Sequence, residues 1–244
     1  MKLEVKNLGK KFKGFIAVNN INFHINEGQT LGVLGPNGCG KTTTIGMLLG
    51  LIKPSNGEIL IDEKNFESLN REKILSNFNF ASPYVELPKK LTVKENLEIY
   101  GRLYGVENLE KRIQEITYDL NLGLFINKKT GELSSGQKNR VSLAKSLINK
   151  PKILFLDEPT ASLDPDIGDF VRKYIEEYKS KNKISILLAS HNMSEVERLC
   201  DKVIMMKEGK IVDRGTCQSL IEKHGRNNLE DTFLKIARNK NELE

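Results

Sequence analysis

The sequence predicts an α/β fold built on a mainly parallel sheet with helices on both faces. In the second half of the chain, buried apolar runs at residues 153–156 and 184–189 alternate with helical patterns. Nearer the start, residues 3–8 and 21–25 alternate apolar and polar side chains, as strands of an antiparallel sheet do. We therefore expect a parallel central sheet preceded by an N-terminal antiparallel subdomain.

The other elements follow from turn and capping signals. Thr92 and Glu95 have the spacing of a capping box, and Pro165 suits the first position of a helix capped by Asp164. We expect one domain over residues 1–225, with a helical insertion around 90–150, and a short helical tail at 226–244. In order, the signals predict strands at 29–34 and 58–61, helices at 41–51, 92–122, 134–149 and 194–199, a hairpin at 203–206 and 210–212, and two closing helices.

The composition is typical of a soluble protein. Of the 244 residues, 39% are hydrophobic and 29% are charged. No apolar run reaches the roughly 18–20 residues of a membrane span, and the start of the chain lacks the apolar core of a signal peptide. We expect a cytoplasmic protein that meets a membrane only through a partner.

The charge distribution and the cysteines argue against a nucleic-acid-binding protein and against a disulfide-rich protein. The net charge of +6 is dispersed over short basic stretches such as 128–129 and 179–183, so it predicts no nucleic-acid partner. The three cysteines, Cys39, Cys200 and Cys217, are an odd number without metal-type spacing. They favour a reducing compartment over a disulfide framework.

Residues 35–42, Gly-Pro-Asn-Gly-Cys-Gly-Lys-Thr, match the phosphate loop and lie between a predicted strand and a predicted helix. The glycines let successive backbone N–H groups converge on phosphates, and the helix N-terminus adds a favourable partial charge. We expect Lys41 to reach the β- and γ-phosphates and the Thr42 hydroxyl to coordinate Mg²⁺.

Two carboxylates end the strand predicted at 153–156, at the edge where open α/β sheets bind ligands. Asp157 is placed to hold Mg²⁺, directly or through water, and Glu158 to polarise an attacking water as general base. His191 follows the strand at 184–189 and is placed to contact a γ-phosphate or to orient that water. His24 and His224 lack such a position and are interpreted as a strand residue and a helix-end residue.

A second helix start also has the features of an anion site. Residues 133–137 read Leu-Ser-Ser-Gly-Gln, in which Ser134 and Gln137 have the capping-box spacing and Gly136 leaves the backbone open. One domain with two anion-binding helix starts suggests that one of them serves a nucleotide held mainly by another molecule.

The order of these motifs, with the loop Ser162-Leu163-Asp164, resembles the nucleotide-binding subunit of ABC transporters over residues 1 to about 215. The resemblance implies a P-loop NTPase fold, ATP and Mg²⁺ as cofactors, and a helical subdomain inserted before the 133–137 signature. It also implies that Phe12 stacks on adenine and Val18 packs near the ribose. The residues that it assigns to the nucleotide are Phe12, Val18, Gly35, Pro36, Asn37, Gly38, Cys39, Gly40, Lys41, Thr42, Thr43, Ser82, Ser134, Gly136, Gln137 and Asp164, with Lys41, Glu158 and His191 catalytic and Thr42 and Asp157 on the metal.

The sequence departs from the family in one important place. Most members of the family have a glutamine that touches Mg²⁺ and senses the membrane partner, and here that position holds Ser82 or, on a count from Leu91, Pro83. Serine has a shorter reach, so a metal contact would need a closer loop or a bridging water. We expect slow basal hydrolysis that depends on the partner. Ser135 also stands where the signature usually has glycine.

The resemblance implies an ATPase that powers transport through a separate transmembrane permease, peripheral on the cytoplasmic face of the membrane. It works with a second ATPase subunit, as a homodimer or a heterodimer. The tail at 228–234 resembles that of ABC-2-type exporters, which favours export. The alternative is a soluble ABC ATPase acting on nucleic acid or the ribosome. It is disfavoured because the 43–133 interval lacks a long coiled coil and the chain has only one such domain. A catalytically dead module is disfavoured because Lys41, Asp157, Glu158 and His191 are all present.

Overall fold

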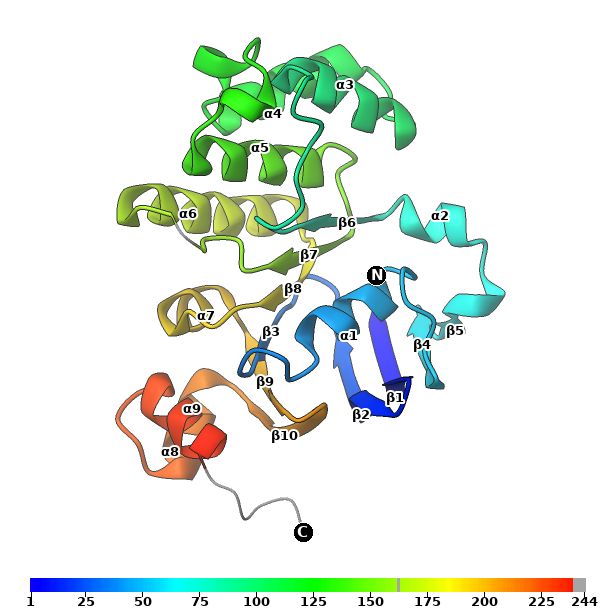
Figure 1. Ribbon diagram of the computed structural model, residues 1–244, viewed down its shortest axis with the longest axis vertical. Helices are drawn as coiled ribbons and strands as arrows, with labels where there is room; N and C mark the ends of the chain where they lie inside the picture. The colour runs from blue at the N-terminus through cyan, green and yellow to red at the C-terminus, as the bar shows by residue number, and fades with distance from the viewer. Residues whose placement is uncertain (162, 239–244) are drawn as a thin grey trace. The chain divides into compact units, whose positions relative to one another are not determined.

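The computed structural model describes residues 1–161 and 163–238 (Figure 1). Its internal contacts divide the chain into two units. The first unit combines Met1–Arg71 with the segment that begins at Ser185, and the second is the continuous stretch Glu72–Ile184. The unit that holds the phosphate loop is therefore assembled from both ends of the chain.

The first unit contains an antiparallel sheet with strand order β2-β1-β4-β5, which confirms the predicted subdomain. The first two strands are longer than predicted, because Lys13 and Gly14, with φ of 34° and 91°, form a tight turn in which Phe12 pairs with Phe15. The strands are β1 (Leu3–Phe12), β2 (Phe15–Ile25), β4 (Asn56–Ile61) and β5 (Lys64–Asn65), and a 3₁₀ turn, Phe66–Ser68, follows.

The same unit contains a set of largely parallel strands in the order β10-β9-β3-β8. Strand β3 (Thr30–Leu34) runs parallel to both β8 (Ser185–Ala189) and β9 (Lys202–Lys207), and β10 (Lys210–Gly215) returns antiparallel to β9. Every residue of β3 and β8 is buried, which explains why both strands are largely apolar after their first residues, Thr30 and Ser185. Because β3 and β8 are parallel, the segments that follow them lie at the same edge.

Helices follow both of these strands. Helix α1 (Lys41–Leu48) follows β3 and ends three residues before its predicted end, because Gly50, with φ of 68°, turns the chain out of the helix. Helix α7 (Met193–Leu199) follows β8, and its N-cap Asn192 accepts a hydrogen bond from the Glu195 N–H.

The two closing helices, α8 (Cys217–His224) and α9 (Leu229–Arg238), belong to the core of the first unit. Leu220, Leu229 and Ile236 form one buried cluster with Leu34, the last residue of β3, and Val196 of α7. The C-terminal helices therefore pack against the end of the strand that leads into the phosphate loop.

The second unit pairs β6 (Phe78–Ala81) in parallel with β7 (Ile153–Asp157) and surrounds them with helices. The helical stretch predicted at 92–122 is two helices, because Gly105 and Asn108, with φ of 65° and 51°, break it. The short elements β5, β6 and α2 (Arg71–Leu75) were not among the predicted ones. The other elements are α3 (Val93–Leu103), α4 (Leu109–Asp119), α5 (Ser135–Leu147), α6 (Pro165–Asn182) and the 3₁₀ turns Gly123–Phe125 and Thr130–Glu132. Among the described residues, no helix is long and apolar enough to cross a membrane.

Candidate functional site

The loop between β3 and α1 has the geometry of an anion cradle. Gly38 and Gly40 have φ of 80° and 109°, values that turn successive N–H groups inward and that side chains disfavour. Gly40 caps α1 with no side-chain hydrogen bond, and no acidic residue lies in the first turn. The N-terminus of α1 therefore presents backbone N–H groups and the positive end of its dipole to this loop.

Lys41 directs its ammonium group back into the loop. The side chain is buried, and Nζ donates hydrogen bonds to the carbonyl oxygens of Gly35 and Pro36 at 2.6 and 3.3 Å. Thr42 is exposed, while Thr44 is buried and donates its hydroxyl to the Gly40 carbonyl. The loop thus concentrates one fixed positive charge where a phosphate would sit.

Packing holds the phosphate loop against two neighbours in the first unit. A Cβ on Gly35 would lie 2.5 Å from the Met206 carbonyl oxygen of β9. The Gly209 N–H donates to the Cys39 carbonyl at 3.1 Å. Cys39 is buried, and burial raises the pKa of its thiol despite the nearby Lys41. The cysteine is a packing residue of the loop, and the three cysteines are free thiols.

The β1–β2 hairpin borders the same loop. A Cβ on Gly40 would lie 2.6 Å from the Ala17 carbonyl oxygen and 3.1 Å from Val18 Cγ2. Val18 is buried, and Phe12, near the hairpin turn, keeps 43% of its surface exposed. The two residues assigned to the base and ribose therefore lie on a hairpin that touches the phosphate loop.

His191 lies at the same edge as the phosphate loop, directly after β8, and is exposed. Its neighbours are fixed by buried hydrogen bonds: Ser190 Oγ donates to Glu195 Oε2 at 2.6 Å and accepts from the Asn192 N–H at 3.1 Å. As predicted, the other histidines are structural: His24 is an exposed residue of β2, and His224 ends α8 in contact with Asp213 at 2.6 Å.

The second unit carries the acidic pair. Asp157 is the last residue of β7 and Glu158 the next, and both are buried. Glu158 has φ of 55°, in the left-handed region that non-glycine residues rarely adopt. Just beyond, the Asn139 amide donates to the Pro159 carbonyl at 2.6 Å and ties this turn to α5. The backbone of Glu158 is thus strained, and the hydrogen bond from Asn139 of α5 fixes the turn that follows it.

The signature forms the helix start that its sequence predicts. Ser134 Oγ accepts from the Gln137 N–H at 3.3 Å, and Gln137 Oε1 accepts from the Ser134 N–H at 3.0 Å. Ser134 is exposed, whereas a Cβ on Gly136 would lie 2.7 Å from Ile167 of α6. The serine faces outward, and Gly136 permits close packing of α5 on α6.

The nucleotide role expected of Ser82 stays a prediction, whereas the cap expected at Asp164 is not made by its side chain in the part of the chain that the structure describes. Ser82 is buried, and its Oγ accepts from the Tyr84 N–H at 3.3 Å, so its hydroxyl holds its own loop. Asp164 occupies the N-cap of α6 but, within residues 1–161 and 163–238, makes no cap hydrogen bond with its side chain. Ser162 of the same loop lies outside the described residues.

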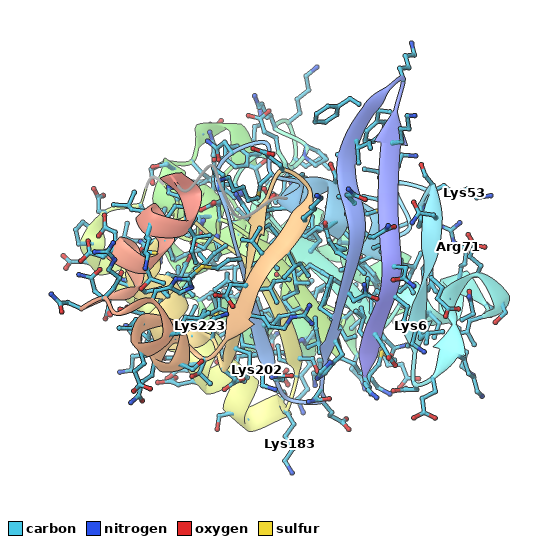
Figure 2. The ribbon with its side chains drawn as sticks, turned by 90° about the horizontal axis from the view of Figure 1, so that it is seen from below. Lys6, Lys53, Arg71, Lys183, Lys202 and Lys223 are labelled. Carbon is cyan, nitrogen blue, oxygen red and sulfur yellow. The ribbon has the colours of Figure 1, made fainter. Side chains whose placement is uncertain are left out.

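The basic side chains come from separate elements. Those labelled in Figure 2 on the first unit include Lys6 of β1, Lys53 after α1, Lys202 of β9 and Lys223 of α8. Sequence reasoning missed two other lysines, Lys10 beside Phe12 and Lys145 within α5. The only available signal was an i, i+2 Lys-Phe pair for Lys10 and a cation on the apolar side of a helix for Lys145.

The comparisons with known proteins agree with one another. A family model described as ABC transporter matches residues 18–161. The chain is 34% identical over 230 residues to the ABC transporter ATP-binding protein NatA of Bacillus subtilis, which covers 91% of each chain. It is 35% identical over 222 residues to the Nod factor export ATP-binding protein I of Burkholderia lata, which covers 90% of this chain and 72% of that one.

Two further matches are a relative named for import and a solved structure of a dimer. The probable sulfate/thiosulfate import ATP-binding protein CysA of Chlorella vulgaris is 32% identical over 238 residues, covering 97% of this chain and all of that one. Among solved structures, a dimeric ATP-binding cassette in a post-hydrolysis state, bound to ADP and phosphate, has a TM-score of 0.80 at 27% identity. That match covers 88% of this chain and 98% of the other.

Proposed function

Because this chain belongs to the ABC transporter family as an ATP-binding ATPase, we propose that it powers export through a separate transmembrane permease. The observation that carries the nucleotide part of the proposal is the phosphate loop. It joins a buried lysine, two glycines with positive φ and an uncapped helix N-terminus in one continuous segment.

The residues after β3 bind the phosphates. The N–H groups of residues 37–43 and the Lys41 ammonium meet the β- and γ-phosphates, and nucleotide takes over the Lys41 hydrogen bonds now made to Gly35 and Pro36. Mg²⁺ prefers hard oxygen ligands, and Thr42 and Asp157 supply a hydroxyl and a carboxylate for it. When bound, the metal neutralises charge on the phosphate oxygens.

Hydrolysis needs a base and a group that orients the water. Glu158 accepts a proton from the attacking water, and its left-handed backbone fixes the direction of its side chain. His191, at the edge shared with the phosphate loop, orients the γ-phosphate and the water. Phe12 stacks on the adenine and Val18 packs near the ribose.

A second copy, or a related subunit, completes the site. Ser134, Gly136, Gln137 and Asp164 serve the nucleotide held by the partner, and ATP closes the dimer because only its triphosphate makes both sets of contacts. The exposed Ser134 at an N-terminal helix start supports this role, as does the dimeric form of the solved cassette.

The transport part of the proposal rests on similarity. We place the catalytic domain, predicted over residues 1–225, on the cytoplasmic face of the membrane and bound to the permease; α9, from the predicted tail at 226–244, packs into the core of the same unit. Basic side chains spread over separate elements do not favour a nucleic-acid partner. The Nod factor relative, whose name specifies export, supports that direction, although the CysA relative is named for import.

Co-purification tests the partner. Tagged full-length protein, solubilised from its native membranes in mild detergent, should retain a multi-span membrane protein, whereas recovery with ribosomes or nucleic acid would contradict the transport function. Inside-out vesicles then test the direction. With external ATP, untargeted mass spectrometry should find compounds that accumulate with the wild type but not with Lys41→Ala, and depletion from preloaded vesicles would indicate import instead.

A further inference from the structure

One face of the Phe12 ring is occupied by a cation from the same strand. The Lys10 ammonium lies 4.8 Å from the centre of the ring. Lys10 and Phe12 are two residues apart on β1, and the pairing with β2 is irregular between Lys10 and Lys11, so it is the ring contact itself that brings the two side chains together. With 43% of its surface exposed, Phe12 keeps its ring accessible beside this cation.

The cation is anchored to the backbone of the loop that follows α1. Lys10 Nζ donates to the carbonyl oxygen of Lys53 at 2.8 Å, in the loop that follows α1 (Figure 2 labels Lys53). The backbone on either side is fixed to the same loop, because the Lys11 N–H donates to Ser55 Oγ and the Ser55 N–H donates to the Gly9 carbonyl. Lys10 therefore has a defined position, unlike a freely moving surface lysine.

The register of the hairpin relates this pair to the nucleotide. Lys10 pairs with Val18 across the β1–β2 hairpin, and Val18 is the residue that abuts Gly40 of the phosphate loop. Phe12 lies two residues further along the strand. A nucleotide whose phosphates occupy the loop thus has the Lys10–Phe12 pair beside it.

We propose that Lys10 is a positioning residue for the nucleobase: it holds the Phe12 ring and polarises it, so that the ring binds the purine more tightly. The inference rests on the proposed nucleotide function. A cation on one face withdraws π density from the ring, which lowers the repulsion between the negative opposite face and the π system of a stacked purine. The interaction between Lys10 and the ring also restricts the rotamers of Phe12 before the base arrives.

The experiment compares a ligand that has a base with one that lacks it. We would titrate full-length protein with ATP and with inorganic tripolyphosphate by calorimetry, using the wild type, Lys10→Met, Lys10→Arg and Phe12→Leu. Lys10→Met should weaken ATP binding by up to about two- to five-fold, because only the part of the cation–ring energy that is coupled to the stacked base contributes to affinity. Lys10→Met should bind tripolyphosphate as tightly as Lys11→Met does, a variant that removes the same charge elsewhere on β1. Lys10→Arg should retain the wild-type ATP affinity.

Lys11→Met is the matched charge control. Lys11 is the exposed neighbour on β1, and its replacement removes the same charge while leaving the Lys10–Phe12 contact in place. The double variant Lys10→Met/Phe12→Leu provides the decisive measurement: if Lys10 acts through the ring, its replacement should have no further effect once the ring is absent.

Three results would overturn the inference: ATP affinity unchanged in Lys10→Met, equal weakening of ATP and tripolyphosphate, or a full Lys10 effect in the Phe12→Leu background. Unchanged melting temperatures exclude a folding defect as the cause. Wild-type protein that binds neither ligand would instead overturn the proposed nucleotide function itself, and the inference with it.

Discussion

The ammonium group of Lys145, in the last turn of α5, donates a hydrogen bond to the carbonyl oxygen of Phe80, on β6, at 2.9 Å. The same ammonium lies 5.5 Å from the centre of the Tyr100 ring of α3. Asn79 reinforces the connection by donating to the Lys145 carbonyl and to the Asn149 side chain. The strand that leads to Ser82 is therefore tied to the helix that begins at the signature.

The half-buried position of Lys145 predicts a pH-dependent stability. Burial lowers the pKa of Lys145 from 10.5 to about 8. Between these values the unfolded chain binds more protons at this site than the folded protein, so the site's contribution to the free energy of unfolding rises with pH. Relative to Lys145→Met, the stability of the wild type should increase by about 1 kcal/mol per pH unit between pH 8.5 and 9.5. Urea unfolding of both proteins measures this difference, and a pH-independent difference would contradict a depressed pKa.

Lys41→Ala should remove nearly all nucleotide affinity. The variant deletes the buried ammonium of the phosphate loop, and a lost buried charge partner weakens binding by at least about 30-fold. Calorimetric titration with ATP measures the loss, with melting temperature as the folding control. Near-normal ATP binding would mean that this loop does not hold the phosphates.

Glu158→Gln should separate ATP binding from hydrolysis. Loss of a general base slows the reaction by about 10²- to 10⁴-fold, while the amide preserves the shape and the left-handed backbone. Because the triphosphate then persists, size-exclusion chromatography with ATP should show a dimer. The double variant Lys41→Ala/Glu158→Gln should stay monomeric, and a monomeric single variant would count against the dimer.

Ser82→Gln tests how the missing glutamine affects hydrolysis. Ser82 is buried and its hydroxyl is engaged with the Tyr84 N–H, so in the wild type it serves its own loop. Glutamine reaches further, and we expect a higher basal ATPase rate that depends less on the permease. Steady-state phosphate release is compared with and without the membrane partner, and Ser82→Ala controls for loss of the loop hydrogen bond. If both rates in Ser82→Gln equal those of the wild type, the position does not limit hydrolysis.

Sequence patterns predicted the parts of the molecule that depend on local chemistry. The capping boxes at Thr92 and Ser134, the strand–loop–helix around Lys41 and the parallel strands before Glu158 and His191 are confirmed. The caps and the strand–loop–helix depend on residues adjacent in the chain, and each strand is marked by its own apolar run, so spacing alone carries this information.

What the patterns missed depends on distant partners. Strand β6 has only four residues, and it pairs with β7 about 75 positions later, so no local period identifies it. The contacts of Lys10 with Lys53 and of Lys145 with Phe80 likewise join separate segments. The functional roles of the site residues remain predictions, which the variants above address.

The division of the chain has a consequence for its synthesis. Residues 72–184 are contiguous and can fold as soon as they leave the ribosome, but β3 must wait for β8 and β9, about 160 residues after the phosphate loop. At about 5–20 residues per second, that interval lasts roughly 10–30 s. During it, the buried strand β3 remains without its two parallel neighbours, so the strand that leads into the phosphate loop completes its pairing only after most of the chain has been made.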